Sequence, residues 1–407
     1  MTGTTLTPPQ EVPGSLREQN AALRADAEAA AVRDGLAPTP GVPPALAGPV
    51  RPGAAGTVAT VEPAQVEAAK FAPLPVLPPP PSYGRVELPP PVPFLYRSEG
   101  GQVIEVTAKY WLDYLAAFYS RYLWWPSQSA LITAVLWTAH TYAREAPEDG
   151  AGVIFPMSPR LFALSSKRNS GKSTLMRLLS CTCPRVAGLE TQPTEYGLLL
   201  SLQTEIPTLL IDELGILLST DKRSQGVQQI LLNGYTNPDP RIGVPGTKLR
   251  ERNKKTERVP LFAPIALAGL DVVEKTASEN ILAILSRGFR IRMVPAPDDA
   301  EPASLDAEAD YAATVVTAIR IAGAGWCDRN REWLRKYIPP AVEGTHRRYR
   351  QICWPLATMA DAAGPEWSKR GRDALAAMQA TWVDAPAAGG EDPMVAMQHD
   401  MERMGLI

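Results

Sequence analysis

The chain has 407 residues, of which 41 are basic and 43 acidic, giving a formal net charge of −2 and a pI near 6.1. This balance excludes binding to nucleic acid through bulk positive charge, so any such contact needs a local basic patch. No secretory signal opens the sequence, and the most apolar segment, Leu123 to Ala139, is interrupted by Pro126 and too short to span a bilayer. We therefore expect a soluble cytoplasmic protein without membrane contact.

Residues 1–100 are predicted to form a disordered Pro/Ala-rich arm. They hold 20 of the 41 prolines, including the runs Pro78 to Pro81 and Pro89 to Pro91. Proline-dense sequence forms neither helix nor central strand and buries too little apolar surface to fold. One helix, Ser15 to Arg33, is expected within the arm, marginally stable when isolated. An extended arm of this kind is suited to recruiting a protein partner.

Residues 101–150 are predicted to be a helical segment that packs on the core. Apolar residues between Tyr110 and Leu123 recur at helical spacing, Pro126 ends that helix, and Ser127 caps a second helix predicted over Gln128 to Arg144. Three tryptophans in this region could instead form a stacking platform for bases. The helical spacing favours core positions for them: Trp124, Trp125 and Trp137.

Residues 151–300 alternate short apolar runs with helical stretches, which is typical of a parallel α/β sheet. The fold class expected here is α/β, with a parallel sheet flanked by helices. The strands are predicted at Arg160 to Leu164, Thr208 to Ile211, Pro260 to Ala268 and Phe289 to Val294, and the helices at Ser173 to Ser180 and Gln225 to Leu232.

The remainder is predicted to be helical up to residue 385 and flexible over residues 386–407. We interpret residues 301–385 as a C-terminal helical lid or appended bundle. Its expected helices are Leu305 to Ala322, Arg329 to Tyr337, Gly344 to Ala363 and Trp367 to Trp382.

A phosphate-binding loop is predicted between the strand ending at Leu164 and the helix that follows. Backbone amides of such a loop converge on phosphate at a helix N-terminus, the lysine reaches the β- and γ-phosphates, and the hydroxyl after it ligates Mg²⁺. A serine replaces the usual first glycine. We expect ATP and Mg²⁺ as cofactors, bound by Ser166, Lys167, Arg168, Asn169, Ser170, Gly171, Lys172, Ser173 and Thr174.

The strand Thr208 to Ile211 ends in two carboxylates, Asp212 and Glu213. Following a phosphate loop, this pattern predicts that Asp212 holds the metal together with Ser173, while Glu213 polarises the attacking water. Two acids capping an ordinary turn would be the preferred interpretation if the motif stood alone.

Two basic features leave alternatives open. Arg287 is interpreted as an arginine finger acting on a neighbouring subunit, or else as a surface arginine paired with an acid. A basic segment, either a hairpin tip directed at a DNA backbone or a solvated loop, contains Lys248, Arg250, Arg252, Lys254, Lys255 and Arg258. The four cysteines lack zinc-ligand spacing and are interpreted as reduced structural thiols, although the Cys181 and Cys183 pair would also suit a soft metal.

The motifs together resemble a family of P-loop ATPases of actinobacteria and their phages and plasmids, catalogued as a domain of unknown function and often found in primase or helicase-like proteins. The resemblance spans about residues 126–378. It is carried by Ala139-His-Thr141, Ser158-Pro-Arg160-Leu, Thr208-Leu-Leu-Ile-Asp-Glu213, Leu232-Asn-Gly234, Ala263-Pro264 with Ala266-Leu-Ala-Gly269, Arg287, Trp354-Pro-Leu356 and Ala360-Asp-Ala-Ala-Gly364.

This resemblance implies an AAA+-like ATPase core that works on DNA during replication of a phage or mobile element. The chain departs from the family at Ile265, where lysine is usual, and no Asn or Thr within Ala263 to Gly269 can sense the γ-phosphate. We expect a DNA-dependent ATPase motor, helicase-like or a helicase loader, that contacts single-stranded or duplex DNA and forms a homo-oligomeric ring such as a hexamer. The alternative is an ATP-controlled switch or scaffold whose arm recruits a partner; a small-molecule kinase lacks a second substrate signature.

Overall fold

The computed structural model describes residues 88–97, 102–145, 153–190, 193–204, 207–212, 222–237, 246–252, 255–270, 279–300 and 302–382. All of them belong to Pro80–Ile407, one of the two units into which the chain divides. The helix predicted at Ser15 to Arg33, the arm up to residue 87 and the tail 386–407 lie outside these ranges.

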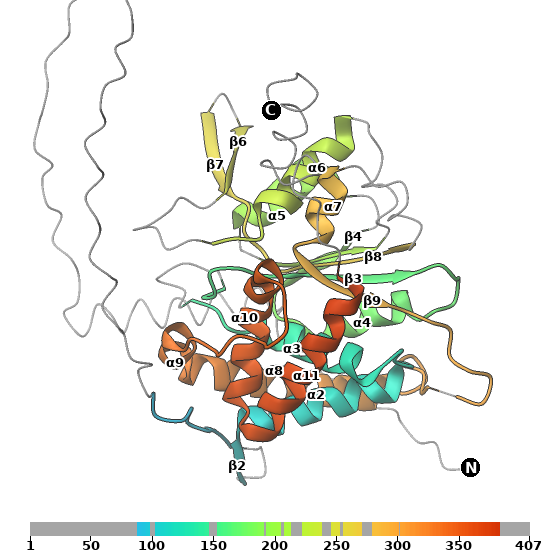
Figure 1. The fold of residues 1–407 in the computed structure, drawn as a ribbon, viewed down its shortest axis with the longest axis vertical. Helices are drawn as coiled ribbons and strands as arrows, with labels where there is room; N and C mark the ends of the chain where they lie inside the picture. Colours follow the sequence, from blue (N-terminus) through green and yellow to red (C-terminus); the bar gives the residue numbers. More distant parts are fainter. Residues whose placement is uncertain are drawn as a thin grey trace, which may run out of the picture. The chain divides into compact units, whose positions relative to one another are not determined.

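A five-stranded parallel sheet is the centre of the fold, in the order β4-β5-β8-β3-β9 (Figure 1). Every neighbouring pair runs parallel, so the carboxyl ends of all five strands meet at one edge. The predicted α/β fold with a parallel sheet is therefore confirmed. The strands are β3 (Arg160–Ser165), β4 (Val186–Glu190), β5 (Thr208–Asp212), β8 (Ile265–Leu270) and β9 (Gly288–Arg292).

Each face of the sheet is buried in its own apolar core, which explains why the strand sequences are continuous apolar runs. In β3, Leu161 and Ala163 enter one core, whereas Phe162 and Leu164 enter the other. The second core is closed by three helices that lie together on one side of the sheet in Figure 1: α5 (Glu195–Thr204), α6 (Lys222–Asn233) and α7 (Glu279–Leu285).

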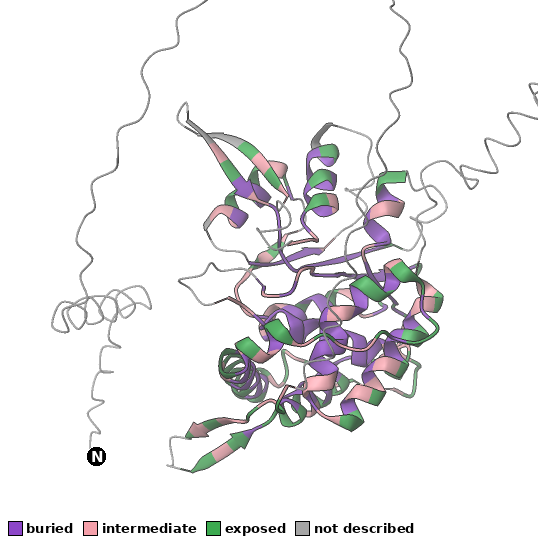
Figure 2. Ribbon diagram, turned by 60° about the vertical axis from the view of Figure 1, so that its left-hand side comes forward, coloured by how far each residue is buried: buried purple, intermediate pink, exposed green. Residues whose placement is uncertain are grey.

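A thicker helical layer covers the opposite face, and Figure 2 shows how much of it is buried. Its central helix, α3 (Gln128–His140), packs against α2, α10 and α11. Because neighbours surround α3, all its residues from Ala130 to His140 are buried and it carries no one-sided stripe. The other helices are α2 (Ala108–Tyr122), α4 (Lys172–Thr182), α8 (Ala309–Arg329), α9 (Arg331–Lys336), α10 (Arg347–Ala362) and α11 (Pro365–Met378), followed by the 3₁₀ turn η3 (Gln379–Thr381).

Local sequence signals set several helix ends. Ser127 caps α3 as predicted, its Oγ accepting from the Ala130 amide at 3.1 Å. Thr107 caps α2 in the same way through Tyr110. The prediction that the second helix continues to Arg144 is wrong, because α3 ends at His140, where amide bonds to the third residue back tighten the last turn.

The tryptophan prediction is confirmed for Trp137, which is fully buried and donates its Nε1 hydrogen to the Pro159 carbonyl at 2.7 Å. Trp125 is half-buried, stacks on Tyr119 and donates to the Tyr119 carbonyl. Trp124 does not follow the prediction, since it stays 40% exposed.

Two predicted boundaries need correction. Residues 94–97, assigned to the arm, form β1 (Phe94–Arg97), which pairs with β2 (Val103–Val106). The helices of residues 301–385 do not form a separate lid, because α10 and α11 pack on α3 and Tyr349 contacts Phe289 of the sheet. The helices α2 and α3 and the helices α10 and α11 bury their apolar faces in a single core, which explains why they fold as one layer.

The sequence patterns missed β4, α5 and α7 and misplaced one strand. The run Pro260 to Ala268 divides, because β7 ends at Pro260 and β8 begins only at Ile265. β4 lies at the sheet edge with partly exposed residues and a register shift, so its pattern is weak. None of the described helices is long and apolar enough to cross a membrane.

Candidate functional site

The loop between β3 and α4 contains two residues in the left-handed backbone region. Gly171, immediately before α4, adopts a left-handed conformation with φ of 83°, and Asn169 has φ of 54°. Glycine and asparagine are the residues that tolerate this region best. Ser166, which replaces the usual glycine, is not among the positive-φ residues of the described chain, so this replacement introduces no backbone strain.

Side chains within the loop hold its shape. Ser165 Oγ accepts from the Lys167 amide at 3.1 Å and lies at the same distance from the Lys167 carbonyl. The Lys172 amine turns back over the loop, donating to the Lys167 carbonyl at 3.3 Å and to Ser170 Oγ at 3.2 Å. The Lys172 ammonium therefore lies above the loop, where its N–H groups can donate hydrogen bonds to an anionic oxygen.

The first turn of α4 is open to a negative ligand. No side chain caps its amides and no acidic residue lies in that turn. The unpaired amides and the helix dipole therefore favour an anion at this point, next to the exposed Ser173.

β5 brings a carboxylate to the same edge of the sheet. β8 lies between β3 and β5, and Asp212, the last residue of β5, pairs with Ala268, which pairs with Ala163 of β3. Neighbouring strands are about 4.8 Å apart, so β5 is roughly 10 Å from β3. Asp212 is half-buried there. Glu213 lies outside the described residues.

Ser173 and Asp212 fit a magnesium site that is shared with a phosphate ligand. Both supply oxygen atoms, and Mg²⁺ is usually held by one or two protein oxygens with water and phosphate completing the shell. Among the described residues no three His, Cys, Asp or Glu side chains gather as a metal site. Burial raises the pKa of the Cys183 thiol to about 12, as expected for a structural cysteine.

A cavity of about 350 Å³ adjoins the loop. Its floor includes the loop residues Asn169, Ser170 and Gly171, together with Thr174 of α4. The walls come from two distant parts of the chain, and sequence reasoning assigned neither of them to a site: Tyr122, Leu123 and Trp124 after α2, and Val294, Ala296, Pro302, Ala303, Ser304 and Leu305 before α8.

Arg287 lies away from this loop. It precedes β9, so it is at the amino edge of the sheet, opposite the edge that carries Lys172 and Asp212. It is half-buried, donates to the Ala283 carbonyl near the end of α7 and lies 5.1 Å from the Tyr235 ring centre. Burial and, secondarily, the charge of Arg348 lower its pKa. Arg287 therefore does not belong to the group of residues at this loop.

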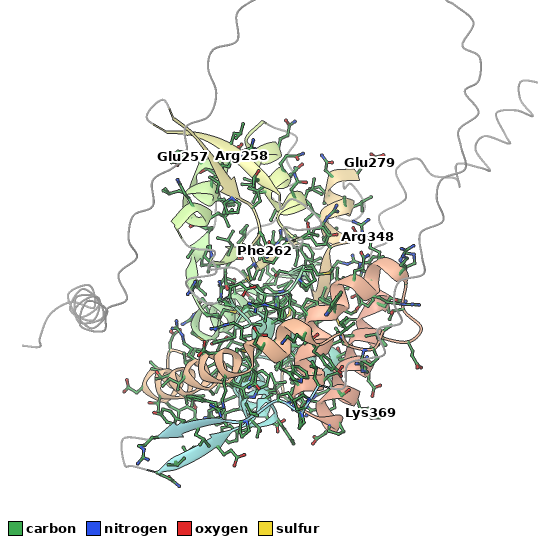
Figure 3. All side chains as sticks on the ribbon, turned by 90° about the vertical axis from the view of Figure 1, so that its left-hand side faces the viewer. Glu257, Arg258, Phe262, Glu279, Arg348 and Lys369 are labelled. Carbon is green, nitrogen blue, oxygen red and sulfur yellow. The ribbon has the colours of Figure 1, made fainter. Side chains whose placement is uncertain are left out.

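The basic segment is part of a hairpin, which agrees with the first of its two interpretations. In it, β6 (Thr247–Arg252) pairs antiparallel with β7 (Lys255–Pro260). The Lys248 amine pairs with Glu195 of α5 at 2.6 Å, whereas Arg258 is exposed. Figure 3 shows Glu257 and Arg258 on the hairpin, on the side of the sheet away from Lys369. Lys254 and the side chains of Arg250, Arg252 and Lys255 lie outside the described residues.

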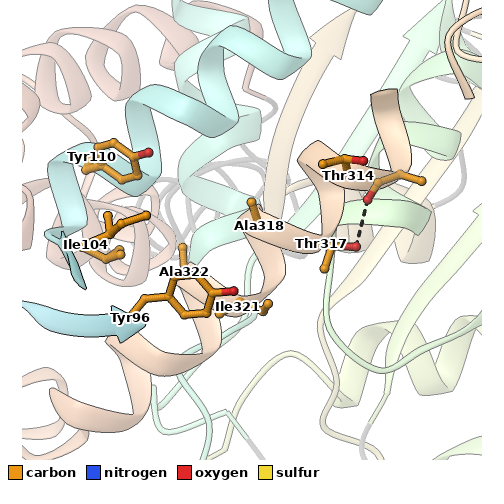
Figure 4. Close-up of a pocket in the computed structure, with 10 residues that line it drawn as sticks. Tyr96, Ile104, Tyr110, Thr314, Thr317, Ala318, Ile321 and Ala322 are labelled. Atoms are coloured by element: carbon orange, nitrogen blue, oxygen red, sulfur yellow. Dashed lines mark hydrogen bonds between the residues drawn. The ribbon is translucent and has the colours of Figure 1, made fainter. Parts of the chain in front are cut away.

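A second cavity, of about 490 Å³, lies between the β1–β2 pair, α2 and α8. Figure 4 shows Tyr96, Ile104 and Tyr110 facing the small residues of α8 across it. No charged side chain lines this cavity, so it offers nothing to neutralise a phosphate. The cavity beside the loop is the better candidate site.

No protein-family model matches the chain, and a search of curated proteins gives no match. Arguments about activity therefore depend on the residues and their geometry.

Proposed function

We propose that this protein binds and hydrolyses ATP with Mg²⁺ as a P-loop ATPase. The observation that carries the proposal is the loop after β3, where a left-handed Gly171 leads into Lys172 at an uncapped helix start. Asp212 ends a strand at the same edge of the sheet, with only β8 between. An anion cradle, an ammonium and a carboxylate at one edge are the groups that phosphoryl transfer requires.

Each group has a role in this proposal. The amides at the start of α4 bind the β-phosphate, and the Lys172 ammonium exchanges its bonds to Lys167 and Ser170 for oxygens of the β- and γ-phosphates. Ser173 and Asp212 hold Mg²⁺, which would neutralise charge on those oxygens. Glu213, which follows Asp212 in the sequence, is proposed to accept a hydrogen bond from the attacking water and so to orient it.

We further propose that hydrolysis is stimulated by DNA and that the active form is a homo-oligomer. The β6–β7 hairpin supports the first part, because it projects a basic segment from the sheet. The place of Arg287 at the opposite sheet edge supports the second, since only a neighbouring copy could use it as a finger.

Phosphate release by the full chain, with and without single-stranded DNA at low salt, tests this function. We expect hydrolysis that DNA accelerates, and an acceleration that fades as salt rises, because phosphate contacts release counterions. Asp212→Asn should remove most activity in either condition. A wild-type rate that DNA leaves unchanged would contradict the DNA-dependent part, and absent hydrolysis would contradict the whole proposal.

Reversing two charges on the hairpin should abolish stimulation and leave basal hydrolysis intact. The variant is Lys254→Glu with Lys255→Glu, and the measurement is the ratio of rates with and without DNA. A matched control reverses two surface lysines of the helical layer, Lys336 and Lys369, both exposed. If both double variants keep the full ratio, the hairpin does not contact DNA.

Replacing Gly171 by alanine should weaken ATP binding. The residue has φ of +83°, which alanine adopts only with strain, and an added Cβ would approach Leu123 Cδ1 to 2.6 Å, so that side chain would also have to move. We expect KM for ATP to rise about tenfold, given the usual cost of a strained φ. Gly364→Ala is the control, because it has φ of +91° with no neighbour within 4 Å of the added atom. An unchanged KM in Gly171→Ala would exclude the loop as the phosphate cradle.

A further inference from the structure

The cavity beside the phosphate loop has the size and lining of a nucleoside site. Its volume of about 350 Å³ lies in the range of small-molecule sites, roughly 300–1,000 Å³. One end is formed by Gly171 and Thr174, next to the proposed phosphate site. The walls beyond combine polar and apolar residues. The polar ones are Tyr122, Arg177 and Ser304, and the apolar ones, which suit the flat face of a base, are Leu123, Val294, Ala296, Pro302, Ala303 and Leu305.

Trp124 is the one large aromatic of this wall that stays accessible. It is 40% exposed, whereas its neighbours Tyr122 and Leu123 are 2% and 5% exposed. The next residue, Trp125, is fixed by its stacking on Tyr119 with ring centres 6.0 Å apart. The backbone on both sides of Trp124 is therefore held, and an indole is presented to the cavity at little conformational cost.

The lining segment 302–305 and the residues that follow it are held in place by contacts with α2 and α4. The Ala303 amide donates to the Arg121 carbonyl at 2.9 Å, and Arg121 pairs with Glu308. Arg177 of α4 binds both oxygens of Asp306, at 2.6 and 3.0 Å. These pairs are individually weak, but together they fix the segment that lines the cavity along with Trp124.

We infer that the base and ribose of the nucleotide occupy this cavity, with the base stacked on Trp124. This inference rests on the proposed function, because it assumes that the loop holds the phosphates. Stacking does not distinguish bases, since every base has a π face, and Arg177, the charged side chain of the lining, is already bound to Asp306. The enzyme should therefore use ATP and GTP with KM values within about tenfold of each other.

Steady-state hydrolysis and binding of a fluorescent ATP analogue by the full chain test the inference. Trp124→Ala should raise KM for ATP about tenfold with little change in kcat, because stacking stabilises the bound nucleotide more than the reacting phosphates. Trp124→Phe should retain most of the affinity. Trp333→Ala is the control, a half-buried tryptophan of α9 that stacks on Tyr337 away from the cavity lining.

The outcomes separate the two proposals. If Trp124→Ala keeps the wild-type KM while Lys172→Ala is inactive, the stacking site is wrong and the ATPase stands. If the KM values for GTP and ATP differ by clearly more than about tenfold, the inference that the site does not discriminate between bases is wrong. If the wild-type chain neither binds the analogue nor hydrolyses ATP, both proposals fail. Thermal unfolding of each variant checks that the fold is retained.

Discussion

Lys172→Ala should lower kcat for ATP hydrolysis by at least about 100-fold, the largest loss expected from a single substitution in this chain. The lysine amine turns back over the loop and donates hydrogen bonds to Lys167 and Ser170. Alanine removes that charge from the β- and γ-phosphates while leaving the backbone amides in place. Phosphate release under saturating ATP measures the loss.

Stability should hardly change in the same variant. The Lys172 amine makes only loop hydrogen bonds, so we expect the free energy of unfolding to stay within about 1 kcal/mol of wild type. Lys109→Ala, on the exposed face of α2, is a control that also removes one lysine charge. Full activity of folded Lys172→Ala would mean that the loop does not serve hydrolysis.

Acidification from pH 7 to pH 5 should destabilise the protein by about 2 kcal/mol through His140 alone. His140 is fully buried, and burial lowers its pKa from 6.5 to about 3. Between these values the unfolded chain binds a proton that the folded chain excludes, so stability is present above pH 6.5 and is lost as pH falls. Its Nδ1 hydrogen is donated to the Trp137 carbonyl, which leaves Nε2 to accept from Ser158 Oγ at 2.9 Å.

Urea unfolding at several pH values measures this dependence. His140→Gln should flatten the stability curve between pH 7 and pH 5, whatever its absolute stability, because glutamine does not titrate. An identical slope in wild type and His140→Gln would show that residue 140 is not the group that resists protonation.

The sequence by itself determined the local features of this protein. Ser127 predicted the start of α3, because a hydroxyl before an apolar run caps helix amides. The apolar run into Ser165 and the Gly171-Lys172-Ser173 turn predicted a strand, a loop and a helix start, each fixed by short-range geometry. The carboxylate after Ile211 likewise predicted the end of a buried strand.

Only the tertiary structure decided how these pieces lie in space. Strand order placed β8 between β3 and β5. The parallel direction of β9 put Arg287 at the edge of the sheet away from the loop. The tertiary structure also placed Trp124 and residues 302–305, almost 180 positions later in the chain, in the lining of one cavity beside Gly171. No local pattern contains such information, because strand order and the packing of distant segments depend on which apolar faces bury one another.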